Sequence, residues 1–156
     1  MERVKKRACE SASTQQYLLR SEHINGYGRL FGGQLMSWID ELAGIVSRRH
    51  CGKVVTTAAI DNLSFRKAAY INDLIVLKGE VTYVGRSSME VRVDTYVETL
   101  DERRSLINRA YLVMVAIDED GSPMEVPGLE LETEEQRQEW EKGRQRYEYR
   151  KNLGAG

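Results

Sequence analysis

The strongest constraint on the fold lies between residues 54 and 117, where four strand-like segments follow one another with only short turns between them. They are residues 54–65, 74–84, 89–97 and 106–117. In the third segment, apolar residues alternate with polar ones at the period of two that is typical of a strand with one buried face. Parallel neighbours need a crossover of about a dozen residues or more, and no gap here holds a helix. The sequence therefore predicts an antiparallel sheet.

One amphipathic helix precedes these strands. Residues 32–50 carry apolar side chains at helical spacing, three basic residues fill the last turn, and Gly52 follows as a stop signal. The residues that we expect to form its buried stripe are Leu35, Trp38, Leu42, Ile45 and Val46, together with Phe31. A long helix and an antiparallel sheet in one chain predict an α+β fold, with one layer of sheet around a central helix.

The chain has 156 residues, of which 41% are hydrophobic, so it is long enough for one domain with its own core. Residues 1–13 are rich in Lys, Arg and Ser, and we expect a flexible lead-in there. The main domain covers residues 14–125 and begins with a short strand at 14–19. Residues 126–156 form a C-terminal extension. It is mostly helical, because the charged segment 133–151 starts with an N-cap-like sequence.

Composition excludes several classes of protein. The 24 acidic and 23 basic residues nearly cancel, whereas a nucleic-acid-binding protein carries a basic excess. No run reaches the roughly 18 apolar residues of a membrane span, and the first residues lack an apolar signal core. Two cysteines are too few for a disulfide scaffold, and His23 and His50 lack the spacing of a metal site. We therefore expect a cytoplasmic protein that binds neither nucleic acid nor membrane and holds no metal.

A second face of the helix is unusual for a surface. Opposite the expected buried stripe lie Gly33, Met36, Asp40, Gly44 and Ser47. Small residues around one carboxylate allow another backbone or a ligand to approach closely. The competing interpretation is that Asp40 and Glu41 form an ordinary solvated pair of charges.

The loop in front of the helix supports the interpretation as a site. Gly32 and Gly33 stand at the helix start, where free N–H groups and the dipole favour negative charge. Asp40 lies about 12 Å further along the axis at 1.5 Å per residue. A substrate stretched along the helix therefore places a carbonyl oxygen near the glycines while Asp40 addresses the carbonyl carbon or a water. The spacing is compatible with acyl transfer.

Other motifs carry less information. Phe31 stands where the third glycine of a dinucleotide fingerprint belongs, and the sequence has neither a Walker A loop nor a G-x-S-x-G elbow. One turn offers a guanidinium, two hydroxyls and free amides: Gly85, Arg86, Ser87 and Ser88. These groups suit a phosphate, and they also make an ordinary turn.

Five blocks of sequence resemble a known family. They are NGYGRLFGG (25–33), MSWIDE (36–41), VVTT (54–57), DNLSF (61–65) and VGRSSMEV (84–91). Taken together and in this order, they strongly resemble the acyl-CoA hydrolase family of hotdog-fold thioesterases, over about residues 14–118. Any one block alone is a weak signal.

The resemblance implies a hotdog fold, in which an antiparallel sheet wraps around a long helix. It also implies subunits that pair by joining sheets, commonly as a trimer of dimers, and active sites at the dimer interface. The residues carried over to catalysis are Asp40 as general base or nucleophile, Asn25 from the other subunit, and the N–H groups of Gly32 and Gly33 as oxyanion hole. The residues carried over to the coenzyme A phosphates are Arg66, Lys67, Gly85, Arg86, Ser87 and Ser88. Coenzyme A is part of substrate and product, so no separate cofactor is implied.

Two positions depart from the family pattern. Ala68 stands where a proline is usual, and Asn72 precedes Asp73 where a glycine is usual. Because Asn is one of the few residues other than glycine that tolerate a left-handed conformation, we expect the second turn to be preserved.

The leading hypothesis is hydrolysis of an acyl-CoA thioester to a free acid and coenzyme A. One alternative is a non-catalytic hotdog module that binds acyl-CoA as a sensor or scaffold and does not need Asp40. Another is a hotdog hydratase or dehydratase, which favours a histidine beside an acid in the helix. Position 40 has no histidine nearby.

Overall fold

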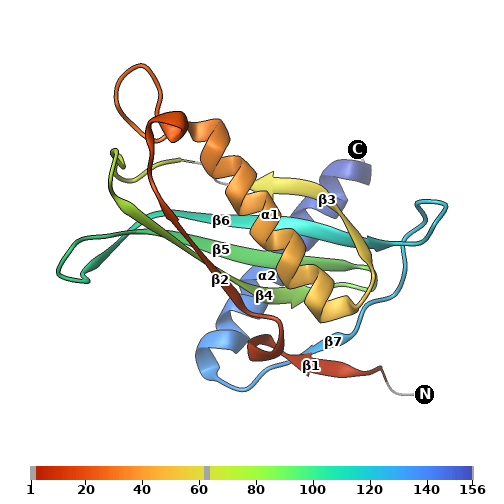
Figure 1. The fold of residues 1–156 in the computed structure, drawn as a ribbon. Helices are drawn as coiled ribbons and strands as arrows, with labels where there is room; N and C mark the ends of the chain where they lie inside the picture. The colour runs from red at the N-terminus through yellow and green to blue at the C-terminus, as the bar shows by residue number, and fades with distance from the viewer. Residues whose placement is uncertain (1–2, 62–63, 156) are drawn as a thin grey trace.

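Two long helices lie on opposite faces of one antiparallel sheet in the computed structural model, which describes residues 3–61 and 64–155 (Figure 1). The sheet contains β2 (Ser13–Leu18), β3 (Val54–Asp61), β4 (Leu74–Val84), β5 (Ser88–Glu98) and β6 (Arg104–Ile117). The strand order is β2-β4-β5-β6-β3, with every pair antiparallel. The predicted α+β class and antiparallel sheet are confirmed.

The helix α1 (Gly32–Cys51) crosses the inner face of this sheet (Figure 1). Its buried apolar side chains are Leu35, Trp38, Ile39, Leu42, Ala43, Val46 and Cys51. Each large one contributes about 1.5–3 kcal/mol by leaving water. Close approach depends on Gly79 of β4, where a Cβ would lie 3.1 Å from Val46 Cγ2 and 3.2 Å from Leu42 Cγ.

The predicted buried stripe is wrong at its margins. Phe31 is 56% exposed, because it is the N-cap residue and precedes the first turn that reaches the sheet. Ile45 is half-buried, while Ser47, predicted on the opposite face, is buried, as is Ala43. The Ser47 hydroxyl donates to Ala43 O at 2.8 Å, which satisfies it without a partner outside the helix. The buried arc of α1 is therefore wider than one stripe and rotated from the expected one.

Two turns have the expected backbone. Gly52 closes α1 in the left-handed region at φ 67°, and its N–H donates to Arg48 O at 2.8 Å. Asn72 also lies in the left-handed region, at φ 73°, in the turn closed by Asp73 N to Tyr70 O. The predicted helix stop and the predicted tolerance of Asn at this turn are confirmed.

The N-terminal segment is more ordered than a flexible lead-in. Its strand β1 (Lys5–Arg7) pairs in parallel with β7 (Gly128–Glu130), and a single turn of 3-10 helix follows at Ala8–Glu10. The Lys6 ammonium donates to Arg49 O at 3.0 Å, at the end of α1. These bonds connect the start of the chain to residues far along it. A second 3-10 turn, Ser21–His23, precedes the glycine-rich loop.

The C-terminal helix α2 (Glu134–Ala155) covers the outer face of the sheet (Figure 1). Arg146 donates to both carboxylate oxygens of Glu90 at 2.8 Å, and its guanidinium lies 3.8 Å from the centre of the Tyr111 ring. Because of the bonds to Glu90, the pKa of Arg146 is raised. The predicted C-terminal helix is confirmed, and none of the described helices is long and apolar enough to cross a membrane.

Gly143 sets the distance between α2 and the sheet, and we expect Gly143→Ala to lower the free energy of unfolding by about 1–3 kcal/mol. A Cβ there would lie 2.6 Å from Tyr83 Cβ and 2.8 Å from Glu90 Oε1. Chemical denaturation measures the change. Gln145→Ala, on an exposed position of the same helix, should change it by less than about 0.5 kcal/mol. Equal effects of the two substitutions would show that α2 does not pack as described.

His50 makes stability depend on pH. The side chain is buried, its Nε2 donates to Pro127 O at 2.9 Å, and burial lowers its pKa. In the unfolded chain the pKa is about 6.5. The unfolded state therefore takes up a proton below about pH 6.5 while the folded state resists it, so stability present above that pH is lost as the pH falls. We expect His50→Gln, which keeps a donor to Pro127, to lose less stability than wild type between about pH 7.5 and 5. Urea titrations at both pH values measure this, and parallel losses would contradict it.

Candidate active site

Asp40 is held at the edge of the sheet. It lies two turns into α1, is half-buried, and accepts a hydrogen bond of 2.5 Å from the Thr57 hydroxyl of β3. Within the described chain, β3 pairs only with β6, so its other edge is open. The register of that pair shifts just after Thr57. A carboxylate with one oxygen held by a strand differs from the solvated charge pair that was the alternative interpretation.

The start of α1 has unpaired N–H groups. Its N-cap is Phe31, which caps with no side chain, and Phe31 O accepts from Gln34 and Leu35 instead. No acceptor among residues 3–61 and 64–155 bonds the N–H of Gly32 or Gly33. These amides and the helix dipole therefore offer a site for a negatively charged oxygen.

Two aromatic rings flank this site. The Phe65 ring lies 3.9 Å from where a Gly32 Cβ would be, and the Phe31 ring lies 2.7 Å from where a Gly33 Cβ would be. Any side chain at either glycine would therefore enter the space beside the free amides, and at Gly33 it would also displace the Phe31 ring.

Asn25 organises the loop that leads to α1. Its Oδ1 accepts from Tyr27 N at 2.9 Å and from Arg29 N at 3.2 Å. Its own N–H donates to Arg29 O at 2.8 Å, and Gly28, at φ 77°, completes the turn. The side-chain oxygen is therefore used within the loop, and the Nδ2 amide has no acceptor among the described residues.

A pocket of about 430 Å³ brings together four of the predicted site residues: Asn25, Gly32, Arg66 and Lys67. Its other lining residues are Arg29, Leu30, Phe65, Ala68 and Ala69. Asp40 and Gly33 are not among them. We call this cavity the asparagine pocket. Within one chain, it does not include the Asp40 carboxylate, so the predicted site is divided into two separate parts.

The predicted phosphate-binding turn lies at the other end of α1. Arg86 O accepts from Val126 N at 2.9 Å, next to Pro127, whose carbonyl binds His50 near the helix C-terminus. Arg3 donates to Gly85 O at 2.6 Å. A helix of 20 residues is about 30 Å long, so residues 85–88 and the asparagine pocket are far apart within one chain.

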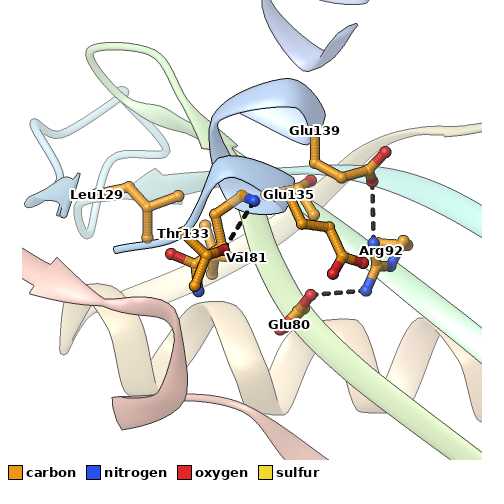
Figure 2. Close-up of a pocket in the computed structure, with 9 residues that line it drawn as sticks. Glu80, Val81, Arg92, Leu129, Thr133, Glu135 and Glu139 are labelled. Atoms are coloured by element: carbon orange, nitrogen blue, oxygen red, sulfur yellow. Dashed lines mark hydrogen bonds and ion pairs between the residues drawn. The ribbon is translucent and has the colours of Figure 1, made fainter. Parts of the chain in front are cut away.

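A second pocket, of about 250 Å³, lies between the start of α2 and the sheet (Figure 2). Arg92 donates to Glu80 at 2.6 Å and to Glu139 at 3.0 Å across it. Burial acts to raise the pKa of Glu139, but the bonds from the Tyr111 hydroxyl and from Arg92 outweigh it, and the pKa is lowered. Arg92 is thus paired with two of the three glutamates that line this pocket, which favours a structural role for the arginine. In the part of the chain that the structure describes, no group of three His, Cys, Asp or Glu residues is placed to hold a metal.

Thr57 is the residue that the sequence reasoning missed. The block VVTT contributed to the resemblance, but nothing in it indicated which hydroxyl faces the helix. Alternation along β3 places Val55, Thr57 and Ala59 on the half-buried side, and Asp40 is reached only because α1 crosses the sheet at this strand.

Comparison with known proteins agrees with this architecture. A family model described as "Thioesterase superfamily" matches residues 27–102. An uncharacterized acyl-CoA thioester hydrolase of Bacillus subtilis, YkhA, is 42% identical over 72% of this chain and 66% of its own length. The cytosolic acyl coenzyme A thioester hydrolase of Mus musculus is 32% identical over 88% of this chain. The match spans only 37% of the mouse protein's length.

Solved structures cover nearly the whole chain. An apo-hexameric acyl-CoA thioesterase superposes with a TM-score of 0.89 at 35% identity, over 97% of this chain and 98% of that one. An acyl-CoA hydrolase from Staphylococcus aureus, solved with butyryl coenzyme A, coenzyme A and coenzyme A disulfide, gives 0.87 at 32% identity over 97% and 93%. The chain belongs to the acyl-CoA hydrolases of the thioesterase superfamily, and its fold is the hotdog fold.

The two hydrogen bonds that Asn25 Oδ1 accepts lead to a prediction for the loop. Asn25→Ala should increase amide hydrogen exchange at Tyr27 and Arg29 and lower the free energy of unfolding by about 1 kcal/mol, because both N–H groups lose their acceptor. Asn25→Asp keeps an Oδ1 acceptor and should protect both amides as wild type does. Exchange followed by NMR measures this, and unchanged protection in Asn25→Ala would contradict it.

Proposed function

We propose that this chain hydrolyses acyl-CoA thioesters to a free carboxylic acid and coenzyme A. The observation that carries the proposal is the arrangement of α1. Its first amides are free, and its carboxylate at Asp40 is held by Thr57 two turns further on. The family to which the chain belongs supports the same reaction.

The amides of Gly32 and Gly33 in one subunit would polarise the thioester carbonyl and hold the oxyanion that develops on it. The attacking Asp40 would come from the other subunit, because within one α1 the carboxylate lies about 12 Å from these amides. Asp40 Oδ1 accepts from Thr57, which leaves Oδ2 for the reaction. As a general base, Asp40 removes a proton from water while the water oxygen attacks the carbonyl carbon. The C–S bond then breaks, and the thiolate of coenzyme A leaves and takes up the proton.

A nucleophilic route uses the same residues. Asp40 attacks the carbonyl carbon, and the C–S bond breaks so that coenzyme A leaves as the thiolate. Water then cleaves the resulting mixed anhydride, which releases the acid, restores the Asp40 carboxylate and supplies the proton that the thiolate takes up. Both routes belong to the proposal. Neither needs a cofactor, since coenzyme A enters with the substrate and leaves with the product.

Variants of the Staphylococcus aureus hydrolase support the choice of residues. Solved structures of that protein carry single replacements by alanine of one asparagine, one aspartate and one threonine. These three residues are spaced along their chain as Asn25, Asp40 and Thr57 are along this one. We infer that Asn25 contributes its free Nδ2 amide to the substrate or the attacking water, and that Thr57 positions Asp40.

The complete site is proposed to need two subunits. Asp40 lies beside the open edge of β3, whose first residue Val54 is 70% exposed, and the Asn25 pocket does not contain it. Antiparallel pairing of two β3 edges would set the start of one α1 near the end of the other. The turn at 85–88 would then approach the pocket with Arg66 and Lys67, so that the two sets of residues predicted to bind the coenzyme A phosphates would lie together. We propose a dimer of this kind, and a trimer of dimers in line with the hexameric relative.

A cytoplasmic location is part of the same proposal. The mouse relative is described as cytosolic, and the proposed substrates carry several negative charges that keep them in aqueous compartments.

Asp40→Asn should lower turnover by about 10²- to 10⁴-fold while coenzyme A binding is retained, because the amide cannot accept the proton or attack. Release of free thiol from short, medium and long acyl-CoAs measures turnover, and calorimetry measures coenzyme A binding. Glu41→Gln changes the neighbouring, exposed carboxylate and should leave turnover near wild type. If Asp40→Asn keeps near-normal turnover, Asp40 is not in the mechanism. If wild type releases thiol from no ester but binds them, the chain is a binding module instead.

A further inference from the structure

Arg29 is the charged residue in the lining of the asparagine pocket to which neither the resemblance nor the proposed mechanism gives a role. It lies three residues before Gly32 and lines the same 430 Å³ pocket. Its guanidinium has no hydrogen bond or ion pair within the described ranges. An unpaired cation beside the proposed oxyanion site needs an explanation.

The backbone of Arg29 is fixed from two sides. Its carbonyl accepts from Asn25 N at 2.8 Å, and its N–H donates to Asn25 Oδ1 at 3.2 Å. On the other side it forms an antiparallel bridge with Tyr70, and the next residue, Leu30, donates to Ala69 O at 2.8 Å. Leu30 is buried while Arg29 is exposed, as alternation requires. The side chain therefore starts from a defined place at the pocket wall.

The pocket is positively charged. Arg29, Arg66 and Lys67 line it, and no carboxylate does. On adjoining segments, Asp73 Oδ2 accepts from Tyr70 N at 2.8 Å, and Glu22 lies 3.6 Å from His23. With the Gly32 N–H also in the lining, nothing in the described lining offsets the charge of Arg29.

We propose that Arg29 binds an anionic group of the substrate, a carboxylate or a phosphate, in the pocket formed with Asn25 and Gly32. This inference rests on the proposed acyl-CoA hydrolase function. A guanidinium binds both groups through two parallel N–H donors. Leu30, Phe65 and Ala68 provide an apolar wall for the carbon chain that carries the group. The anion is either the distal carboxylate of a dicarboxylic acyl group or a phosphate of coenzyme A.

Three substrates distinguish these sources: butyryl-CoA, succinyl-CoA and S-butyryl-pantetheine, which has no phosphate. Steady-state thiol release gives KM and kcat for wild type, Arg29→Gln and Arg29→Lys. For a bound acyl carboxylate, we expect Arg29→Gln to raise KM by about 10- to 100-fold for succinyl-CoA alone. For a bound phosphate, KM should rise by a similar factor for both coenzyme A esters and not for the pantetheine ester. Arg29→Lys keeps the positive charge but lacks the two parallel N–H donors of a guanidinium, so it should give an intermediate KM.

Arg103→Gln is the matched control, since Arg103 is an exposed arginine on the β5–β6 turn that pairs with Asp101. It should leave all three KM values unchanged. Unchanged KM values in Arg29→Gln, with an active wild type, overturn this proposal and leave the proposed function intact. A wild type that cleaves none of the three esters refutes the proposed function itself. Thermal unfolding of Arg29→Gln should match wild type, because its side chain has no partner to lose.

Discussion

The packing of α1 against the inner face of the sheet is the contact on which the rest of the molecule depends. At Gly79 the helix and β4 approach so closely that only a hydrogen fits between strand backbone and the side chains of Leu42 and Val46. This contact determines which way the helix is rotated. That rotation directs Asp40 toward Thr57 on the edge strand and leaves the first amides of α1 beside the loop of Asn25. The geometry of the site is thus a consequence of core packing.

Periodicity and turn residues were sufficient to predict the sheet and the long helix, because both signals are local. β4 begins and ends at the predicted residues, and α1 extends one residue beyond its predicted end. The pairing of β1 with β7 could not be predicted in the same way, since it joins Lys5 to Gly128. Three residues in each strand carry no periodic signal, and only the folded chain brings them together. The exposure of Phe31 was missed for a related reason, because a helical wheel contains no information on where the sheet ends.

The candidate site likewise has a part that local sequence signals predict and a part that depends on tertiary structure. Asn25, Gly32, Arg66 and Lys67 share one pocket, as expected of residues near the start of one helix and the loop that covers it. The role of Thr57 depends on how α1 crosses β3, a tertiary relation that no spacing along the chain reports. Residues 85–88 lie at the far end of the helix, so their proposed part in the site depends on an assembly of subunits.

On the outer face of the sheet, the alternation of charged and apolar residues correctly predicted a strand but did not predict that one of its charged side chains is buried. In β5, Glu90, Arg92 and Asp94 alternate with apolar residues, and such alternation predicts charged side chains in water. Glu90 is only 2% exposed, because α2 places Arg146 against it. Removing one partner of a buried pair costs about 3–5 kcal/mol, since the other charge is left without compensation. The docking of α2 therefore depends on matched charges and a close approach at Gly143. Trp140 and Tyr147 of α2 also pack against Tyr83 of β4. A mostly charged helix can thus be an integral layer of the fold, held by a few aromatic contacts and by ion pairs to the strand that it covers.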